Sequence, residues 1–137
     1  MGEQHPGTTP DGATEARSSS HIAALTKMVK AFVDEREWGQ FHSPKNLAMA
    51  LAGEVGELAA EFQWLTEGDS EEVRAPGPLR QRVKDEVADV AIYLLLLAER
   101  CNIDLAMAVA AKLESNEARY PVAASRGSAE KARLDAN

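Results

Sequence analysis

The chain of 137 residues is long enough for one domain with a hydrophobic core and too short for a second domain. Its 45% apolar and 27% charged residues match ordinary globular proteins, which excludes wholesale disorder. The formal net charge of −7 argues against a nucleic acid polymer as partner, because proteins that hold such backbones normally present a basic surface. The one cysteine, Cys101, cannot form an internal disulfide and fits a reducing compartment, so we expect a cytoplasmic protein.

The ends of the sequence and its apolar runs suggest no membrane partner. The N-terminal residues do not resemble a signal peptide, and the longest apolar run, Val90 to Ala98, is about half of what a membrane span needs. Residues 1–17 have few large apolar side chains and are expected to form a flexible tail. A helical domain is expected over residues 18–121. The small, polar segment 122–137 is expected to be loose or packed on a neighbouring subunit.

Two helices are predicted in the first half of the chain. Ser18 to Ser20 offer caps for a helix with apolar residues at three- and four-residue steps, which is predicted to reach Trp38 before Gly39 ends it. Ser43-Pro44 is a strong start signal, because Ser caps free amides and Pro at the first helical position loses no hydrogen bond. The second helix is predicted to reach about Glu67.

In the second half of the sequence, a loop and two more helices are predicted. The polar residues 68–77 contain a Pro-Gly pair and are predicted to form a loop. Pro78 opens a third helix, which Asn102 ends, and Asp104 caps a fourth helix over about residues 105–118. Four helices with short connections indicate an all-α, antiparallel four-helix bundle.

The third predicted helix also suggests an oligomer. From Val87 to Ala98 it is apolar nearly all round, and such a helix needs cover on more than one side. A bundle of this size leaves part of that surface bare. We therefore expect a homodimer or a homotetramer.

The second helix carries three acids on one face: Glu54, Glu57 and Glu61, spaced three and four residues apart. A solvated acidic face is the usual explanation of such a run. After Lys45, however, this helix contains no Lys or Arg that would pair with the acids. The uncompensated repulsion favours a functional role.

The third helix carries a second pair of acids. Glu86 and Asp89 are one turn apart, and Asp89 lies within an apolar stretch, where a lone carboxylate costs several kcal/mol unless it is paired or binds metal. Two such pairs on antiparallel helices can converge into a cage of oxygen ligands, which suits Mg²⁺, or Mn²⁺ as an alternative. A di-iron site is the competing interpretation, but it needs Glu-x-x-His steps. His5, His21 and His42 lie outside both helices, which favours Mg²⁺.

These residues match a known pattern. Glu54-x-x-Glu57, 28 intervening residues and Glu86-x-x-Asp89 resemble the motif of the all-α MazG-like nucleoside triphosphate pyrophosphohydrolases. The runs GEVGELAAEFQW and DEVADVAIYLLLLA are similar to the dCTP pyrophosphatase branch, as are DEREWGQFHSPKNLA before them and KLESNEARYP after them. The resemblance implies that the four acids hold the magnesium ions that bind a triphosphate. It leaves Glu57 and Glu61 as the candidates for a catalytic base.

The resemblance spans about residues 21–128 and also implies a set of substrate-binding residues. Polar groups of the family's Lys-x-x-x-Asn-x-x-Arg-Tyr-Pro run reach the phosphates or the sugar, and aromatic side chains form the pocket for the base. A solvated helix end is the alternative for Arg119, and core or interface packing is the alternative for Trp38 and Trp64. The implied substrate-binding residues are Trp38, Gln40, Phe41, His42, Trp64, Tyr93, Lys112, Asn116 and Arg119.

The resemblance therefore predicts an enzyme. It would be a Mg²⁺-dependent hydrolase that converts a deoxynucleoside triphosphate, dCTP or a modified dCTP, to the monophosphate and pyrophosphate, and so sanitises the nucleotide pool. The alternative from another class is a non-catalytic, helical, oligomeric module that binds Mg²⁺-nucleotide without turnover. Product formation from a triphosphate separates the two hypotheses.

Overall fold

The computed structural model describes residues 11–131, with side chains described from residue 21 onward. In this part of the chain all regular elements are helical, so the all-α class is confirmed, and none of the helices combines the length and apolar character needed to cross a membrane. The long helices are α1 (Asp11–Asp34), α2 (Pro44–Ala60), α4 (Pro78–Arg100) and α5 (Leu105–Arg119). The short ones are η1 (Trp38–Phe41), α3 (Glu67–Ser70), η2 (Glu71–Arg74) and α6 (Val122–Ser125).

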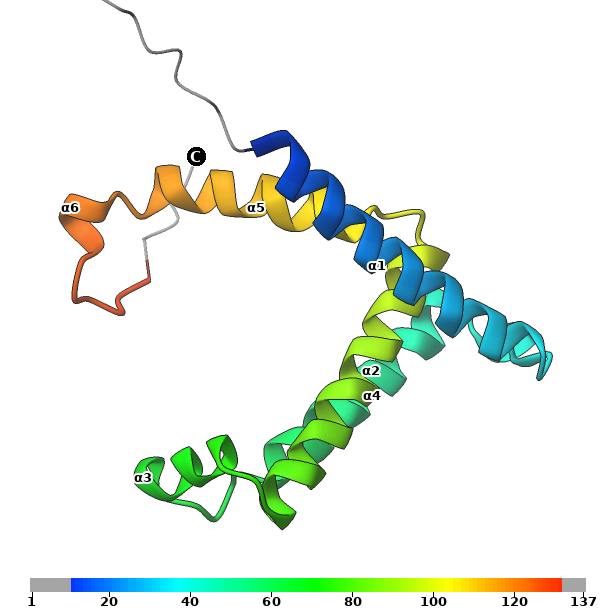
Figure 1. Cartoon of the computed structure of the whole chain (residues 1–137), viewed down its shortest axis with the longest axis horizontal. Coiled ribbons are helices and arrows are strands. Elements are labelled where there is room, and N and C mark those ends of the chain that lie inside the picture. Colours follow the sequence, from blue (N-terminus) through cyan, green and yellow to red (C-terminus); the bar gives the residue numbers. More distant parts are fainter. Residues whose placement is uncertain (1–10, 132–137) are drawn as a thin grey trace, which may run out of the picture.

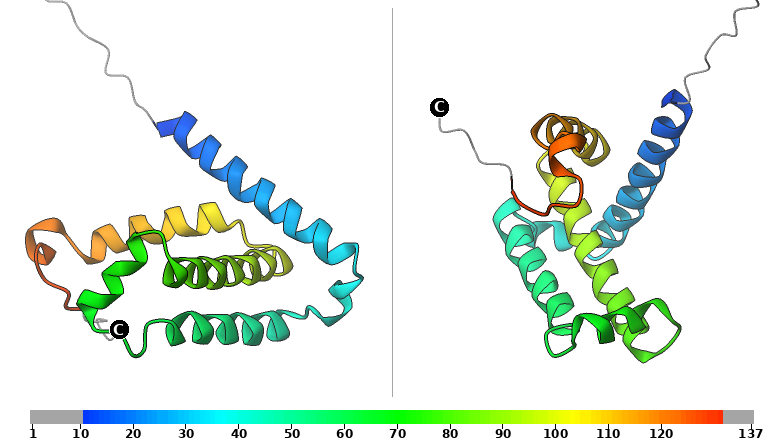
Figure 2. Two further views of the ribbon diagram at one scale, coloured as in Figure 1. Left: turned by 60° about the horizontal axis from the view of Figure 1, so that its bottom comes forward. Right: turned by 90° about the vertical axis from the view of Figure 1, so that its left-hand side faces the viewer.

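The helices are arranged around the antiparallel pair of α2 and α4, which pack more extensively on each other than any other two elements (Figure 1). α1 packs on α4 and on α5, at the end of the pair where α4 finishes. α3 and η2 lie at the opposite end. Both views of Figure 2 show α1 extending away from the other helices toward its N-terminal end. Within one chain the four long helices thus form an open arrangement, and the expected antiparallel four-helix bundle is not confirmed.

The small hydrophobic core explains this open arrangement. Val33, Leu47 and Leu96, one from each of α1, α2 and α4, form the buried cluster, and Leu47 is only 1% exposed. Many other large apolar side chains are exposed, among them Met28 and Leu113. A single chain buries too little apolar surface to hold four helices together, and exposed apolar surface of this extent marks an interaction site.

Three helix ends lie where the sequence signals predict them. The Ser43 side chain accepts a hydrogen bond from the Asn46 amide at 3.1 Å, and Asp104 accepts one from the Met107 amide at 3.0 Å. Both residues are therefore N-caps, which satisfy amides that have no partner inside the helix. Asn102 has a φ of 53°, the left-handed conformation that ends α4.

The first helix begins earlier in the chain than predicted. α1 begins at Asp11, within the expected tail 1–17, because this segment contains Ala, Glu and Arg, which favour helix, and an existing helix extends at low cost. Residues 1–10 and 132–137 lie outside the described part. In the expected C-terminal tail, the short helix α6 is present.

α1 ends earlier than predicted, at Asp34 instead of Trp38. Glu37 adopts a left-handed φ of 54°, which turns the chain out of the helical path. The Gln40 side chain then donates a hydrogen bond to the Glu37 carbonyl at 3.0 Å, and the segment forms the separate 3-10 helix η1.

The prediction for the end of the second helix and for the following loop was also wrong. α2 ends at Ala60, where the amides of Glu61 and Phe62 bond to carbonyls three residues back, as in a tightened last turn. Thr66 then accepts a hydrogen bond from the Asp69 amide at 3.1 Å and starts a new helix. Two short helical turns, α3 and η2, therefore occupy most of the segment predicted as a loop.

Replacement of Leu47 by alanine should destabilise the fold, because this side chain lies at the centre of the buried cluster. We expect the free energy of unfolding to fall by about 2–5 kcal/mol, the range for a buried leucine truncated to alanine. Urea denaturation followed by circular dichroism measures this loss. Lys45→Ala, at an exposed position of the same helix, is the control, with an expected change below about 0.5 kcal/mol. Equal losses for both variants would contradict this assignment of the core.

Candidate metal centre and adjoining cavity

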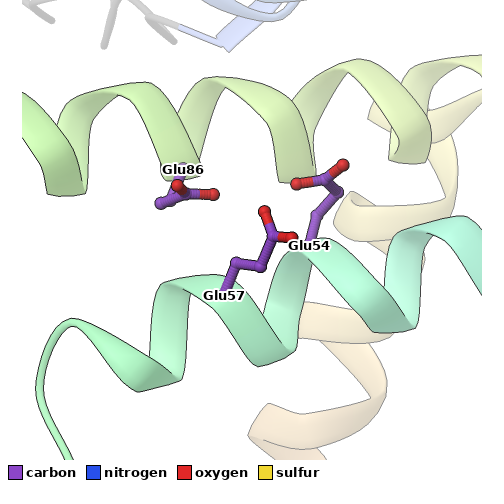
Figure 3. A group of neighbouring side chains, drawn as sticks. All are labelled: Glu54, Glu57 and Glu86. Carbon is purple, nitrogen blue, oxygen red and sulfur yellow. The ribbon is translucent and has the colours of Figure 1, made fainter.

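Three carboxylates converge between α2 and α4, as Figure 3 shows. Carboxylate oxygens of Glu54, Glu57 and Glu86 lie within 4.8 Å of one another. The three-residue step between Glu54 and Glu57 puts both on the face of α2 that packs on α4, and Glu86 meets them from α4. The structure thus brings together three of the four predicted metal ligands.

Asp89 lies beside this group and faces a neighbouring cavity. It follows Glu86 by one turn of α4, and it lines the same cavity as Glu54. The sequence suggested that Asp89 has little access to water, but its side chain is exposed, because the described helices leave this face of α4 uncovered. Exposed side chains change rotamer within nanoseconds, so Asp89 is free to turn toward the other acids.

Burial and mutual repulsion make the acid group unfavourable without a cation. One oxygen of Glu54 and one of Glu86, the Oε2 atom of each, are buried and find no hydrogen-bond partner among residues 11–131. Burial raises the pKa of both carboxyls, and the charges of Glu57 and Asp89 raise the pKa values further. Oxygen atoms without partners in a convergent acidic group are suitable ligands for a hard divalent cation. The donor set therefore fits a divalent metal ion.

A cavity of about 270 Å³ adjoins the acids. It combines aromatic rings, an imidazole and two carboxylates, so it can hold a planar, polar ring next to the metal ligands. The rings of Phe32 and Trp38 pack edge to face within it, with centroids 5.7 Å apart. The residues that line the cavity are Phe32, Val33, Trp38, His42, Glu54, Asp89, Ile92, Tyr93 and Leu96.

The cavity contains three of the predicted substrate-binding residues and four apolar residues that the sequence analysis did not assign to a site: Phe32, Val33, Ile92 and Leu96. Trp38, His42 and Tyr93 line the cavity as the resemblance implied for a base pocket. Of the four apolar residues, Phe32 and Ile92 present large side chains to the cavity. Ile92 lies three residues after Asp89 on the same helix, and this spacing was the available signal.

η1 contributes Trp38 to the cavity and is fixed to α2 by a hydrogen bond. Asn46 Nδ2 donates to the Phe41 carbonyl at 2.9 Å. Phe41 itself is 60% exposed, and neither Phe41 nor Gln40 lines the cavity. Trp64, beyond the C-terminal end of α2, is 88% exposed and also lies outside the cavity lining. Substrate binding by these three residues stays a prediction.

The predicted phosphate-binding residues of α5 are not brought to the acids within one chain. Lys112, Asn116 and Arg119 lie on a helix that packs on α1, whereas the acids lie between α2 and α4. Arg119 is placed over the ring of Tyr120, with its guanidinium carbon 5.6 Å from the ring centroid. The role of these residues in substrate binding stays a prediction.

Glu61 lies at the end of the acid group that is farther from the cavity. Arg82 Nε donates a hydrogen bond to Glu61 Oε2 at 2.8 Å, which joins α2 to α4. The Glu61 charge also raises the pKa of Glu86, so Glu61 is close to the metal site. The sequence analysis missed Arg82, although its position four residues before Glu86 places both on one helical face.

The fold and the site together define an all-helical protein with a carboxylate metal centre between two antiparallel helices. Residues 50–133 match the MazG-like family, and the chain belongs to this family. This match covers α4 and α5, together with most of α2. It includes all four predicted metal ligands.

Named relatives are similar over most of the chain. The dCTP pyrophosphatase 1 of Bos taurus is 43% identical over 134 residues, which cover 93% of this chain and 76% of the bovine protein. The dCTP pyrophosphatase 1 of Homo sapiens is 47% identical over 113 residues, 78% of this chain and 63% of the human protein. The crystal structure of a pyrophosphatase from Archaeoglobus fulgidus DSM 4304 is 34% identical with a TM-score of 0.66 and covers 87% of this chain and 99% of that one. The chain therefore spans less than two thirds of the human relative's length.

Without divalent metal, the acid group should make the protein less stable as the pH rises. The folded-state pKa values of Glu54 and Glu86 lie above the ordinary 4.5, so the folded state binds these protons more tightly than the unfolded chain. The contribution of these two protonated carboxyls to the stability of the fold is fully present below about pH 4.5. It is lost as the pH rises through their raised folded-state pKa values. Melting temperatures measured in EDTA across this range should fall accordingly, and added Mg²⁺ should raise them at neutral pH.

Glu86→Gln should weaken this pH dependence and raise the melting temperature of the metal-free protein at neutral pH. The substitution removes one of the crowded charges and keeps the shape of the side chain. Glu117→Gln, an exposed acid on α5, is the matched control and should leave the profile unchanged. An identical response of the two variants would contradict the repulsion within the acid group.

Proposed function

We propose that this chain is a Mg²⁺-dependent nucleoside triphosphate pyrophosphatase that hydrolyses dCTP, or a modified dCTP, to the monophosphate and pyrophosphate. The observation that carries the proposal is the convergence of three carboxylates beside an aromatic-lined cavity. Membership of the MazG-like family and the similarity to dCTP pyrophosphatase 1 support the same reaction. The enzyme would sanitise the nucleotide pool of the cytoplasm, the compartment expected from the sequence.

Glu54, Glu57, Glu86 and Asp89 are the proposed metal ligands. An all-oxygen set of carboxylates favours Mg²⁺, with Mn²⁺ as an alternative ion. When bound, the ion neutralises charge on the phosphate oxygens and activates water at neutral pH. Asp89 lines both the cation site and the cavity in this proposal, so it lies between the base and the reacting phosphate.

Glu57 is the proposed general base, and Glu61 is the alternative. Glu57 is exposed and lies within the convergent group, so it can accept a proton from the water that attacks the α-phosphorus. Glu61 already accepts a hydrogen bond from Arg82. A proton on Glu61 would remove the charge that pairs with this guanidinium, which disfavours Glu61 as the base.

The adjoining cavity is the proposed site of the base. Its volume of about 270 Å³ lies just below the range of about 300–1,000 Å³ that is usual for drug-sized ligands. A one-ring pyrimidine suits this size better than a purine. Trp38 and Tyr93 supply ring surface, and His42 supplies a polar group for the edge of the base.

We further propose that the protein acts as a homodimer or a homotetramer. Val87, Leu94, Val109 and Leu113 are large apolar side chains of α4 and α5 that remain exposed in one chain. A second copy that covers them would complete the small core. It would also offer a way for the polar residues of a neighbouring α5 to reach the triphosphate.

Leu113→Glu should weaken this assembly, because it places a charge within the exposed apolar surface. Light scattering after gel filtration should give the wild type a mass of two or four chains of 14.8 kDa, and the variant a lower mass at equal concentration. Arg126→Glu introduces the same side chain at an exposed polar position and should leave the mass unchanged. A wild type that stays monomeric at high concentration would refute the proposed assembly.

Glu57→Gln should lower kcat by about a hundredfold or more, the usual contribution of a general base, and should leave the circular dichroism spectrum unchanged. Release of dCMP and pyrophosphate from dCTP is the measurement, and Glu61→Gln is the comparison, with a smaller expected loss. Full activity of Glu57→Gln would mean that the base is misassigned. Assays with 5-methyl-dCTP, dUTP, dTTP and the ribonucleotides define the preferred base. If the wild type releases pyrophosphate from none of them, the non-catalytic nucleotide-binding module is the better explanation.

A further inference from the structure

We infer that Arg82 binds the β- and γ-phosphates of the substrate, the part that leaves as pyrophosphate, and that Glu61 positions the guanidinium group for this contact. The inference rests on the proposed hydrolysis and deepens it. It assigns a leaving-group site to two residues at the end of the α2 and α4 pair that is remote from the cavity.

The order of residues along the α2 and α4 pair supports this assignment. Because the helices are antiparallel, a forward step on α2 faces a backward step on α4 (Figure 3). From the cavity outward, the facing pairs are Glu54 with Asp89, Glu57 with Glu86, and Glu61 with Arg82.

A nucleotide that places its base in the cavity would extend its phosphates along this row. Arg82 precedes Asp89 by seven residues, which corresponds to about 10 Å along the helix axis. This distance is comparable with the length of a triphosphate chain. The α-phosphate would lie at the acids, where the water oxygen bonds to phosphorus. The bond to the bridging oxygen of the β-phosphate breaks, and its electron pair leaves with pyrophosphate at Arg82.

The guanidinium of Arg82 is oriented and still has donors to offer. Nε donates to Glu61 Oε2 at 2.8 Å, and among the described residues this is its one hydrogen bond. A guanidinium has five N–H donors, so the terminal groups remain available for a two-pronged contact with phosphate. The Arg82 side chain is 55% exposed and Glu61 only 21%, so the carboxylate is the anchor and the cation is the accessible partner.

The location of this ion pair distinguishes it from the other ion pairs of the described residues. Lys30 with Glu99 joins α1 to α4, and the two remaining pairs are local in sequence. Arg82 with Glu61 is the pair that links the two helices of the metal site. It puts a positive charge at the end of an acidic row, where negative charge builds up on the leaving group.

Binding of a hydrolysis-resistant triphosphate tests the inference independently of turnover. In the presence of Mg²⁺, calorimetry gives the Kd of α,β-imido-dCTP and of dCMP for each variant. Arg82→Ala should weaken binding of the triphosphate analogue about tenfold or more, as expected for a charge-assisted contact, and should leave the Kd of dCMP within about twofold. Arg82→Lys keeps the positive charge but lacks the paired N–H donors of the guanidinium, so it should recover only part of the lost affinity for the triphosphate analogue.

Lys84→Ala is the matched control, because it removes the same charge from α4 two residues away and should leave both Kd values unchanged. Glu61→Gln should weaken binding of the triphosphate analogue less than Arg82→Ala does, and it should leave the Kd of dCMP unchanged. A triphosphate preference over dCMP that survives in Arg82→Ala would overturn the inference. So would an equal loss for both ligands, which would indicate a structural role. Failure of the wild type to hydrolyse dCTP would instead refute the proposed function, and the binding comparison would still decide the role of Arg82.

Discussion

The packing of α2 against α4 is the constraint on which the rest of the structure depends. Leu47 and Leu96 anchor the pair at one end, and their burial holds the two helices at a fixed distance. This packing forces Glu54 and Glu86 together, with buried oxygen atoms that have no partner. The apolar contacts thus maintain an electrostatically unfavourable group, which a divalent cation relieves. The same helix pair provides both the stability of the fold and the affinity for metal.

Local features of the fold were predictable because their causes are local. A capping side chain such as Ser43 or Asp104 acts within three residues of its own position. The three-residue steps of the acids fix their helical face by geometry alone. Two helices with acids on their facing sides can meet in few ways, so the convergence of acids from α2 and α4 could also be anticipated.

Features that depend on partners distant in sequence could not be predicted in this way. Asp89 is exposed because none of the described helices covers its face of α4, although its neighbours in sequence are apolar. Arg82 forms its ion pair with Glu61, which lies 21 positions away in the sequence, and no short motif predicts this pairing. The left-handed turn at Glu37, which separates η1 from α1, is uncommon for a residue other than glycine or asparagine.

The proposed mechanism separates the recognition of the base from the chemistry of the phosphates. The cavity takes its rings from α1, η1 and α4, whereas the acids and Arg82 come from α2 and α4 alone. η1 is a short segment, tied to α2 through Asn46, so its side chains can differ without disturbing the metal ligands. If the cavity holds the base as proposed, a change at Trp38 or His42 alters which base is accepted and leaves phosphate binding intact. On this architecture, related proteins can act on different nucleotides while they share one metal motif.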